Sequence, residues 1–324
     1  MSAARNGHWV ARPASATGMS STVAPPRRVA TAQSLFDLSR GRQATLSIAQ
    51  PGLAAVLAAG GLPAGRVVWI GLVAAWAGFL AVFSLNDVLD RRVDAAALRA
   101  GKAVVDGYDL DAAFMRHPLA QGALSLRFSL AWVAGLALIA AVGAWLLGPL
   151  CLALFAAAVA LEVVYCGLRS ATWAKTIVSG VMVGLGGLAG WAAVAPPRWS
   201  ALPVFAFLAL WEIGCRNLAN DLADLGPDLA VGIRSVATTF GPVIAARATL
   251  VVAVAVLLSV PFLGLGTVAL TLALVSGAAL VAWPAAVLVR RPTSARAGWY
   301  FNRASLYPVA ILLAAVGAWA VTRP

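Results

Sequence analysis

Two short stretches of this chain carry carboxylates at the same intervals, although the chain has only 12 acidic residues in 324. Each stretch is an Asn-Asp pair followed by two more aspartates: Asn86, Asp87, Asp90 and Asp94 in the first, and Asn220, Asp221, Asp224 and Asp228 in the second. On a helix, the three carboxylates of the first stretch share one face. Carboxylate oxygens bind hard cations, and Mg²⁺ usually takes one or two of them and completes its shell with water and phosphate oxygens. The repeated pattern therefore predicts a two-sided Mg²⁺ and diphosphate clamp.

The plainer interpretation is that each stretch is a solvated helix end. One D-x-x-D pattern is usually that. However, both copies close an apolar run, and near hydrocarbon each carboxylate costs about 2.5–3.5 kcal/mol on insertion scales. Aspartates on one face also repel each other. Bound cations remove both costs, so two copies favour the metal clamp over coincidence.

The composition indicates a polytopic membrane protein, because 61% of the residues are hydrophobic, 11% are charged and the mean hydropathy is +0.88. The net charge of +12 then concerns topology and lipid headgroups. Basic patches interleaved with aromatic residues are absent, so no nucleic-acid partner is expected. The three cysteines lie singly in apolar runs and predict neither a disulfide nor a zinc site.

Nine apolar runs predict an all-α integral membrane protein with nine transmembrane helices. Most runs are long enough to cross a hydrocarbon layer of about 30 Å as a helix of about 20 residues. The first is the weakest, because Pro51 and Gly52 interrupt it. The expected spans are residues 44–62, 66–86, 122–147, 149–168, 176–195, 201–220, 243–263, 267–289 and 304–322.

The distribution of basic residues predicts the orientation. Residues 1–40 are rich in Arg, Ser, Ala and Pro and are expected to form a disordered cytoplasmic tail before a transmembrane domain over residues 41–324. With the N-terminus inside, nearly all basic residues lie on the inner side. Both aspartate stretches then face the cytoplasm, at the ends of the second and sixth spans. The arginine- and alanine-rich composition favours a bacterial inner membrane.

At these residues the chain resembles the UbiA superfamily of intramembrane prenyltransferases. The stretch Asn86–Asp94 matches that family's NDxxDxxxD motif, and Asp221, Asp224 and Asp228 match its second aspartate motif. The sequence from Met115 to Gly122 is similar to an R-P-L-x-x-G element, and Gly232 to Ser235 to a G-x-x-S/T element. The resemblance covers about residues 40–320. It implies nine helices around a central cavity, with Mg²⁺ and an isoprenoid diphosphate bound there.

Prenyl transfer breaks an allylic C–O bond, so cations near the clamp must share the charge of the leaving diphosphate. Candidate catalytic residues are Arg116, Arg234, Lys175 and Tyr165. Candidate diphosphate-binding residues are Asn86, Asn220, Arg169 and Lys102, and the candidate Mg²⁺ ligands are the six aspartates. For each cation the alternative role is an anchor at the inner membrane surface. A pair between Glu212 and Arg216, at i and i+4, is also expected, and Glu162 is a further buried carboxylate that requires a partner.

Two features depart from the family pattern. The interval between Asp94 and Arg116 is longer than usual, so the first inner loop carries an insertion. His117 stands before Pro118, where the family usually has arginine. Because a guanidinium stays charged and suits phosphate oxygens, we expect Arg116 to bind phosphate and His117 to pack beneath the loop.

The expected activity is Mg²⁺-dependent transfer of a prenyl group from an isoprenoid diphosphate to a lipophilic or aromatic acceptor inside the membrane. Within enzymes, a UbiA-type terpene cyclase or a polyprenyl-phosphate ribosyltransferase remains open. From another class, a cation-coupled transporter also places carboxylates in a membrane, but near its midplane. The position of the aspartates at span ends favours an enzyme.

Overall fold

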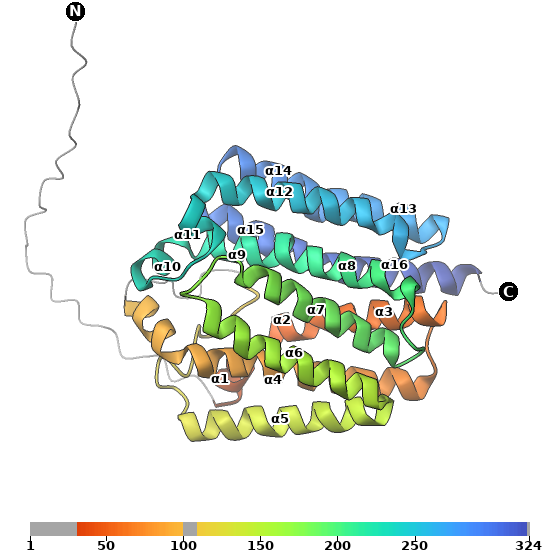
Figure 1. The fold of residues 1–324 in the computed structure, drawn as a ribbon, viewed down its shortest axis with the longest axis horizontal. Coiled ribbons are helices and arrows are strands. Elements are labelled where there is room, and N and C mark those ends of the chain that lie inside the picture. Colours follow the sequence, from red (N-terminus) through yellow and green to blue (C-terminus); the bar gives the residue numbers. More distant parts are fainter. Residues whose placement is uncertain (1–30, 100–108, 323–324) are drawn as a thin grey trace, which may run out of the picture.

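The computed structural model describes residues 31–99 and 109–322. Helices form all the regular secondary structure of these residues. Figure 1 shows the long helices side by side, with the short helices α10 (Leu225–Val231) and α11 (Val236–Phe240) at the left-hand end of the bundle. That end is the one at which the aspartate stretches lie.

Eight helical segments of the described residues are long and apolar enough to cross a membrane. Four are single helices and four are compound: α4 (Gly65–Arg99), α5 (Leu126–Leu147), α6 (Pro149–Leu168), α7 (Lys175–Ala192), Trp199–Ala223, Pro242–Leu263, Thr267–Arg290 and Ser294–Val321. The compound ones contain α8 (Leu202–Trp211), α9 (Leu218–Ala223), α12 (Pro242–Ser259), α13 (Thr267–Gly277), α14 (Trp283–Arg290), α15 (Ser294–Ala304) and α16 (Tyr307–Thr322).

The predicted count of nine single spanning helices is not confirmed, because the first expected span is divided. It consists of α2 (Gly41–Ser47) and α3 (Ala49–Ala59), which meet at Ile48 and are each too short to cross alone. Pro51 explains the division. It lies in the first turn of α3 and has no N–H to donate to the carbonyl of Ser47, so the helix is interrupted there.

The expected tail also ends earlier than predicted. Thr31–Leu38 forms helix α1, in which Ser34, Asp37 and Leu38 are buried. These side chains pack beside α2 and α4, so this part of the chain belongs to the folded domain. The remainder of the expected tail, residues 1–30, lies outside the described residues.

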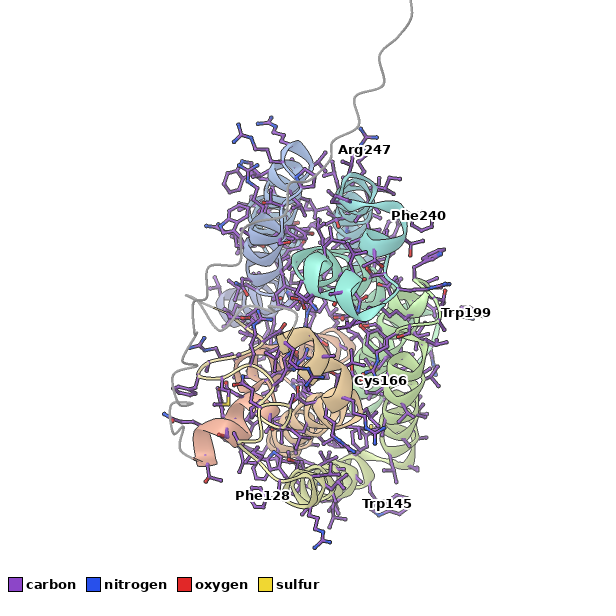
Figure 2. All side chains as sticks on the ribbon, turned by 90° about the vertical axis from the view of Figure 1, so that its left-hand side faces the viewer. Phe128, Trp145, Cys166, Trp199, Phe240 and Arg247 are labelled. Carbon is purple, nitrogen blue, oxygen red and sulfur yellow. The ribbon has the colours of Figure 1, made fainter. Side chains whose placement is uncertain are left out.

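The outer surface of the bundle is apolar, as a protein in hydrocarbon requires. Figure 2, which looks along the helices from the aspartate end, shows Phe128, Trp145, Trp199 and Phe240 at the rim. All four side chains are exposed. The turn between α5 and α6 is tight because Gly148 adopts φ 145°, which a side chain would strain, and Pro149 opens the next helix.

Candidate active site

The two aspartate stretches face each other across one end of the bundle. The first lies on α4, which continues beyond its expected end at residue 86 as far as Arg99, so its three carboxylates share a helical face as predicted. The second is bent: Asp224 separates α9 from α10 with φ −93° and ψ 12°. Helix α10 packs against α4, which brings the two stretches together.

Two basic side chains from other segments pair with the carboxylates of α4. The Nδ1 atom of His117 is 3.0 Å from Oδ1 of Asp87 and 3.2 Å from Oδ2 of Asp94. Arg169, at the end of α6, forms an ion pair with Asp90. The mutual repulsion inferred from the spacing is therefore offset within the protein itself, by cations that come from distant parts of the chain.

The asparagine of the first stretch joins three segments. The Nδ2 atom of Asn86 donates to Oε1 of Glu162 at 2.8 Å, and its Oδ1 accepts from Nη2 of Arg40 at 3.0 Å. Arg40 adopts a left-handed conformation (φ 43°) between α1 and α2, and its guanidinium is also 3.7 Å from Asp111. Glu162 thus has the partner that a buried carboxylate requires.

Asn217, Tyr165 and Lys175 form a chain of polar contacts that ends on the carboxylate of Asp221. The Nζ atom of Lys175 lies 2.9 Å from Oδ1 of Asp221 and 3.3 Å from the hydroxyl of Tyr165. That hydroxyl also accepts from Nδ2 of Asn217 at 3.1 Å. With two donors on its oxygen, the Tyr165 hydroxyl keeps its own proton for a third group, such as a phosphate oxygen.

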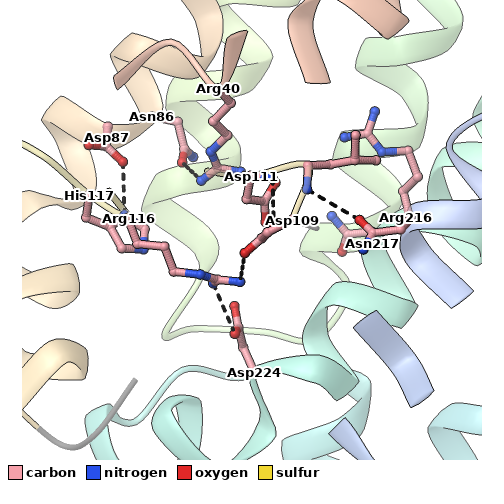
Figure 3. A network of polar contacts seen from close by, with 12 residues as sticks. Arg40, Asn86, Asp87, Asp109, Asp111, Arg116, His117, Arg216, Asn217 and Asp224 are labelled. Carbon is pink, nitrogen blue, oxygen red and sulfur yellow. Dashed lines mark hydrogen bonds and ion pairs between the residues drawn. The ribbon is translucent and has the colours of Figure 1, made fainter. Parts of the chain in front are cut away.

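Arg116 crosses the space between the two stretches (Figure 3). Its guanidinium bonds Asp109 and lies 3.9 Å from Oδ1 of Asp224. Asp109 and Asp111 belong to the loop of residues 109–124, which follows α4 after a segment outside the described residues. This loop therefore supplies carboxylates as well as a cation to the mouth of the site.

Asp37 fixes that loop from α1. Its carboxylate accepts the backbone N–H groups of Ala113, Phe114 and Met115 at 2.6, 2.9 and 2.6 Å. Three such charge-assisted bonds hold the residues immediately before Arg116. Burial nevertheless raises the pKa of Asp37, against the effect of the three donors.

The charges at the mouth are strongly coupled. Burial lowers the pKa of His117, but its hydrogen bonds to Asp87 and Asp94 outweigh burial and raise it to about 9. Burial likewise opposes the charge of Arg40 and Arg116, and nearby aspartates raise the pKa of both. His117 is therefore a cation at neutral pH, clamped between two carboxylates beneath the loop.

The carboxylates fit a divalent cation. Oδ2 of Asp87 and Oδ2 of Asp221 are buried without a hydrogen-bond partner, one in each stretch. Buried polar atoms in proteins are nearly always satisfied, and hard cations such as Mg²⁺ take carboxylate oxygens as ligands. Each stretch thus offers a carboxylate oxygen for Mg²⁺ in addition to those that face the protein's own cations.

A cavity of about 560 Å³ opens between the two stretches and continues into the bundle. Its polar end is lined by aspartates of both stretches together with Arg116, Tyr165, Arg169 and Lys175. Farther in, the lining is apolar and includes Gly71, Phe79, Phe155, Gly186 and Gly190. Along α7 the cavity follows the helix from Lys175 to Gly190, about 22 Å at 1.5 Å per residue.

The expected pair of Glu212 and Arg216 is present, with Nε and Oε2 3.7 Å apart. It lies in a π-helical segment, Glu212–Asn217, between α8 and α9. Glu212 accepts from Ser179 at 3.0 Å, and Arg216 lies over the rings of Trp211 and Phe301. π-Helical segments are rare and occur often at functional sites.

The structure brings most of the predicted site residues to the cavity. Those that line it are Asn86, Asp90, Asp94, Arg116, Tyr165, Arg169, Lys175, Asn220, Asp221, Asp224 and Asp228. Asp87 lies behind them against His117. Arg234, expected to be a leading cation, is outside this lining and instead donates to the carbonyl of Ala171 at 3.4 Å. Lys102 lies outside the described residues.

Sequence reasoning missed Arg40, Asp37, Asp109 and Asp111. The first two lie within residues 1–40, for which the sequence predicts a tail, and the others lie in an inserted loop without a recognisable pattern. The partners of Asp37 and Arg40 are about 40 to 80 residues away in sequence. One signal in the sequence could have indicated that this segment is folded: Asp37 is the first acidic residue of the chain and stands alone in an otherwise basic region.

The comparisons with known proteins concern the family and the fold. The model of the UbiA prenyltransferase family matches residues 48–306. A search of curated protein sequences finds no match. Among solved structures, the apo structure of a UbiA homologue from Aeropyrum pernix K1 is similar at 21% identity with a TM-score of 0.67, over 86% of this chain and 96% of that one.

Two further solved structures share the fold. A UbiA homologue from Archaeoglobus fulgidus, bound to DMAPP and Mg²⁺, has a TM-score of 0.61 at 16% identity, over 86% of this chain and 98% of that one. A digeranylgeranylglyceryl phosphate synthase has a TM-score of 0.62 at 14% identity, over 88% of this chain and 99% of that one. At these identities the likeness concerns the fold alone.

Proposed function

Because the chain belongs to the UbiA prenyltransferase family, we propose that it transfers a prenyl group from an isoprenoid diphosphate to a lipophilic or aromatic acceptor within the membrane. The observation that carries this proposal is the meeting of two aspartate stretches at the mouth of a long apolar cavity. The polar end suits a diphosphate and the apolar end suits a hydrocarbon chain. A solved UbiA homologue holds DMAPP together with Mg²⁺.

The proposed metal site uses Asp87, Asp90 and Asp94 on α4 with the aspartates of the second stretch. When bound there, Mg²⁺ supplies positive charge for the diphosphate oxygens as the C–O bond breaks. The buried oxygens of Asp87 and Asp221 without partners support this assignment. Asn86 and Asn220 flank the aspartates and complete the polar lining.

The basic residues at the mouth have a second partner in this scheme. Arg116, Arg169 and Lys175 each pair with an aspartate of the clamp. When the diphosphate binds, its oxygens offer these side chains an alternative partner, and the released carboxylate oxygens become available to the metal. The protein's cations then stabilise the leaving group, with the Tyr165 hydroxyl as an additional donor. Removal of water from this end strengthens every such contact.

The apolar part of the cavity indicates a donor with a long chain. An extended isoprenoid unit is about 5 Å long, because it adds four carbons at single-bond lengths near 1.5 Å. The stretch along α7 from Lys175 to Gly190 therefore accommodates about four units. Phe83 lies one turn before Asn86 on α4 and stacks on Phe79, with ring centroids 6.3 Å apart, so the two rings offer their faces to an allylic cation.

The proposal places the protein in a bacterial cytoplasmic membrane with its N-terminus and aspartate end inside. The basic residues at that end support this orientation under the positive-inside rule. Reporter fusions after Ala95 and after Leu229 should both report the cytoplasm. Opposite signals from the two fusions would contradict the shared site.

The test is an assay of the full chain in lipid vesicles with labelled isoprenoid diphosphates of one to six units, followed by analysis of extracted lipids. Transfer predicts diphosphate release that requires Mg²⁺, together with a larger lipid product when acceptor lipids are present. A cyclase would release diphosphate and form a cyclic hydrocarbon without acceptor. Absence of diphosphate release under all conditions would contradict prenyl transfer and cyclisation, and would leave the ribosyltransferase and the transporter as the alternatives.

A further inference from the structure

His117 completes a three-residue group that the aspartate pattern alone does not contain. One carboxylate oxygen each from Asp87 and Asp94 and one imidazole nitrogen lie within 4.8 Å of one another. The group combines one residue of the 109–124 loop with two residues that share one face of α4. All three side chains are largely closed to solvent.

The distances within this group match those between neighbouring ligands of one metal ion. Two ligand atoms at right angles, each about 2.1 Å from an octahedral ion, are about 3.0 Å apart. The Nδ1 atom of His117 lies 3.0 Å from Asp87 Oδ1 and 3.2 Å from Asp94 Oδ2. An ion could therefore take the place of the proton that Nδ1 shares with these two oxygens.

A second observation concerns the other oxygen of the Asp87 carboxylate. Asp87 is only 3% exposed, so water does not reach its side chain freely, and its Oδ2 atom has no hydrogen-bond partner. The Asp87 carboxylate therefore lacks, on this oxygen, a partner that a bound cation would supply. Buried carboxylate oxygens are seldom left in this condition.

We propose that His117 is a nitrogen ligand, through Nδ1, of the metal ion held by Asp87 and Asp94, and that this position prefers a divalent first-row transition metal to Mg²⁺. Mg²⁺ binds oxygen ligands almost exclusively, whereas imidazole suits transition metals. The inference rests on the proposed function, because that function places a metal at this aspartate stretch. On binding, the ion takes the nitrogen lone pair, and the Nδ1 proton leaves to solvent.

The chain permits a sharp experiment because it contains two histidines, His8 and His117. The full chain is purified through a tag without histidine and loaded with one equivalent of Mn²⁺ in detergent. Electron spin-echo envelope modulation then detects imidazole nitrogen bonded to the ion. We expect the nitrogen modulation in the wild-type protein and in His8→Gln, and its loss in His117→Gln.

Competition by Mg²⁺ gives a second measurement on the same samples. The Mg²⁺ concentration that displaces half of the bound Mn²⁺ should fall by about tenfold in His117→Gln, the lower end of the loss that one supporting contact at a metal site produces. His8→Gln serves as the matched control and should leave this concentration unchanged. Thermal unfolding of each variant shows that it is folded.

The outcomes separate this inference from the proposed function. Bound Mn²⁺ without nitrogen modulation, or modulation that persists in His117→Gln, would overturn the histidine ligand and leave an all-oxygen metal site in place. No binding of Mn²⁺ or Mg²⁺ by the wild-type protein would contradict both the inference and the proposed clamp. Modulation that depends on His117 supports the inference whatever the prenyl substrate is.

Discussion

The Nζ atom of Lys175 and Oδ1 of Asp221 form an ion pair of 2.9 Å, in which both side chains are almost closed to solvent. The pair joins the start of α7 to α9, and Tyr165 of α6 contacts the same ammonium group. The other oxygen of Asp221 has no partner. One carboxylate thus connects a fixed cation of the protein with the position proposed for a metal.

We expect Asp221→Asn to abolish diphosphate release and also to lower the stability of the ligand-free protein. From sequence alone, removal of one of several aspartates would relieve repulsion. In the structure it leaves the Lys175 ammonium buried without its partner, and breaking such a pair typically costs about 3–5 kcal/mol. Thermal unfolding in detergent measures the stability.

Lys175→Met combined with Asp221→Asn provides the control. The double variant should regain much of the stability lost by Asp221→Asn, because no unpaired charge remains, and it should stay inactive. Strictly additive losses of the two single substitutions would show that the pair is not coupled.

The second prediction concerns the N-terminal boundary of the folded domain. Deletion of residues 1–30 should preserve activity, whereas deletion of residues 1–40 should abolish it. The longer deletion removes Asp37, which holds the loop before Arg116, and Arg40, which bonds Asn86. Activity and thermal unfolding of both truncated proteins in vesicles test this.

Asp37→Asn isolates the role of the loop within the intact chain. It keeps the shape of the side chain but replaces one of the two accepting carboxylate oxygens with an NH2 group, which cannot accept from a backbone N–H. The Michaelis constant for the diphosphate should rise, because the loop that carries Arg116 is held less firmly. Each hydrogen bond to a charged group contributes about 1.5–3 kcal/mol to such a fixed conformation. An unchanged constant would remove Asp37 from the positioning of the site.

The parts of the site that sequence predicted are those that regular helices generate. The interval of Asp87, Asp90 and Asp94 fixes their common face on α4, whatever surrounds them. Long apolar runs likewise predicted the spans that α4, α5 and α6 confirm. Periodicity carries such information because each residue advances a helix by a fixed angle.

The parts that sequence did not predict depend on tertiary contacts or on backbone breaks. Arg234 follows a family-like glycine, yet its guanidinium contacts the turn after α6. The break at Ile48 arises from Pro51 three residues later, which made the first run weak without showing where it would divide. Asp37 bonds the 109–124 loop, and Arg40 bonds Asn86 of α4 and pairs with Asp111 of that loop. No periodic pattern in the sequence predicts these contacts.

The third prediction distinguishes Arg116 from His117. With saturating Mg²⁺, Arg116→Gln should lower kcat/KM by about 10²-fold, the size expected when one fixed donor to a developing anion is lost. Arg116 spans Asp109 and Asp224 across the mouth, where the diphosphate is proposed to bind. His117 contacts only the α4 carboxylates among the ion pairs described, so His117→Gln should cost less under the same conditions.

A comparison of kcat/KM for the two variants across donor concentrations makes this test. Arg116→Lys should recover part of the loss, because a lysine keeps the charge without the planar fork of guanidinium. A larger loss in His117→Gln than in Arg116→Gln, at saturating Mg²⁺, would assign the phosphate contact to the histidine.

The last prediction concerns the length of the donor chain. Gly186 lines the cavity on α7, and a Cβ atom built on it meets nothing within 4 Å. Gly186→Phe should therefore fold and fill the cavity about 16 Å along α7 from Lys175, at 1.5 Å per residue. That depth holds about three isoprenoid units of about 5 Å each. The variant should retain activity with donors of one or two units and lose it with donors of four or more.

Gly135→Phe is the matched control, because Gly135 is also open to a Cβ but lies on the exposed side of α5, outside the cavity lining. It should keep the wild-type preference for chain length. Rates with donors of one to six units, measured for the wild-type protein and both variants in the same vesicles, decide the matter. If Gly186→Phe reduced activity equally for all lengths, the prenyl chain would not follow α7, and the inner part of the cavity would have to be assigned to the acceptor.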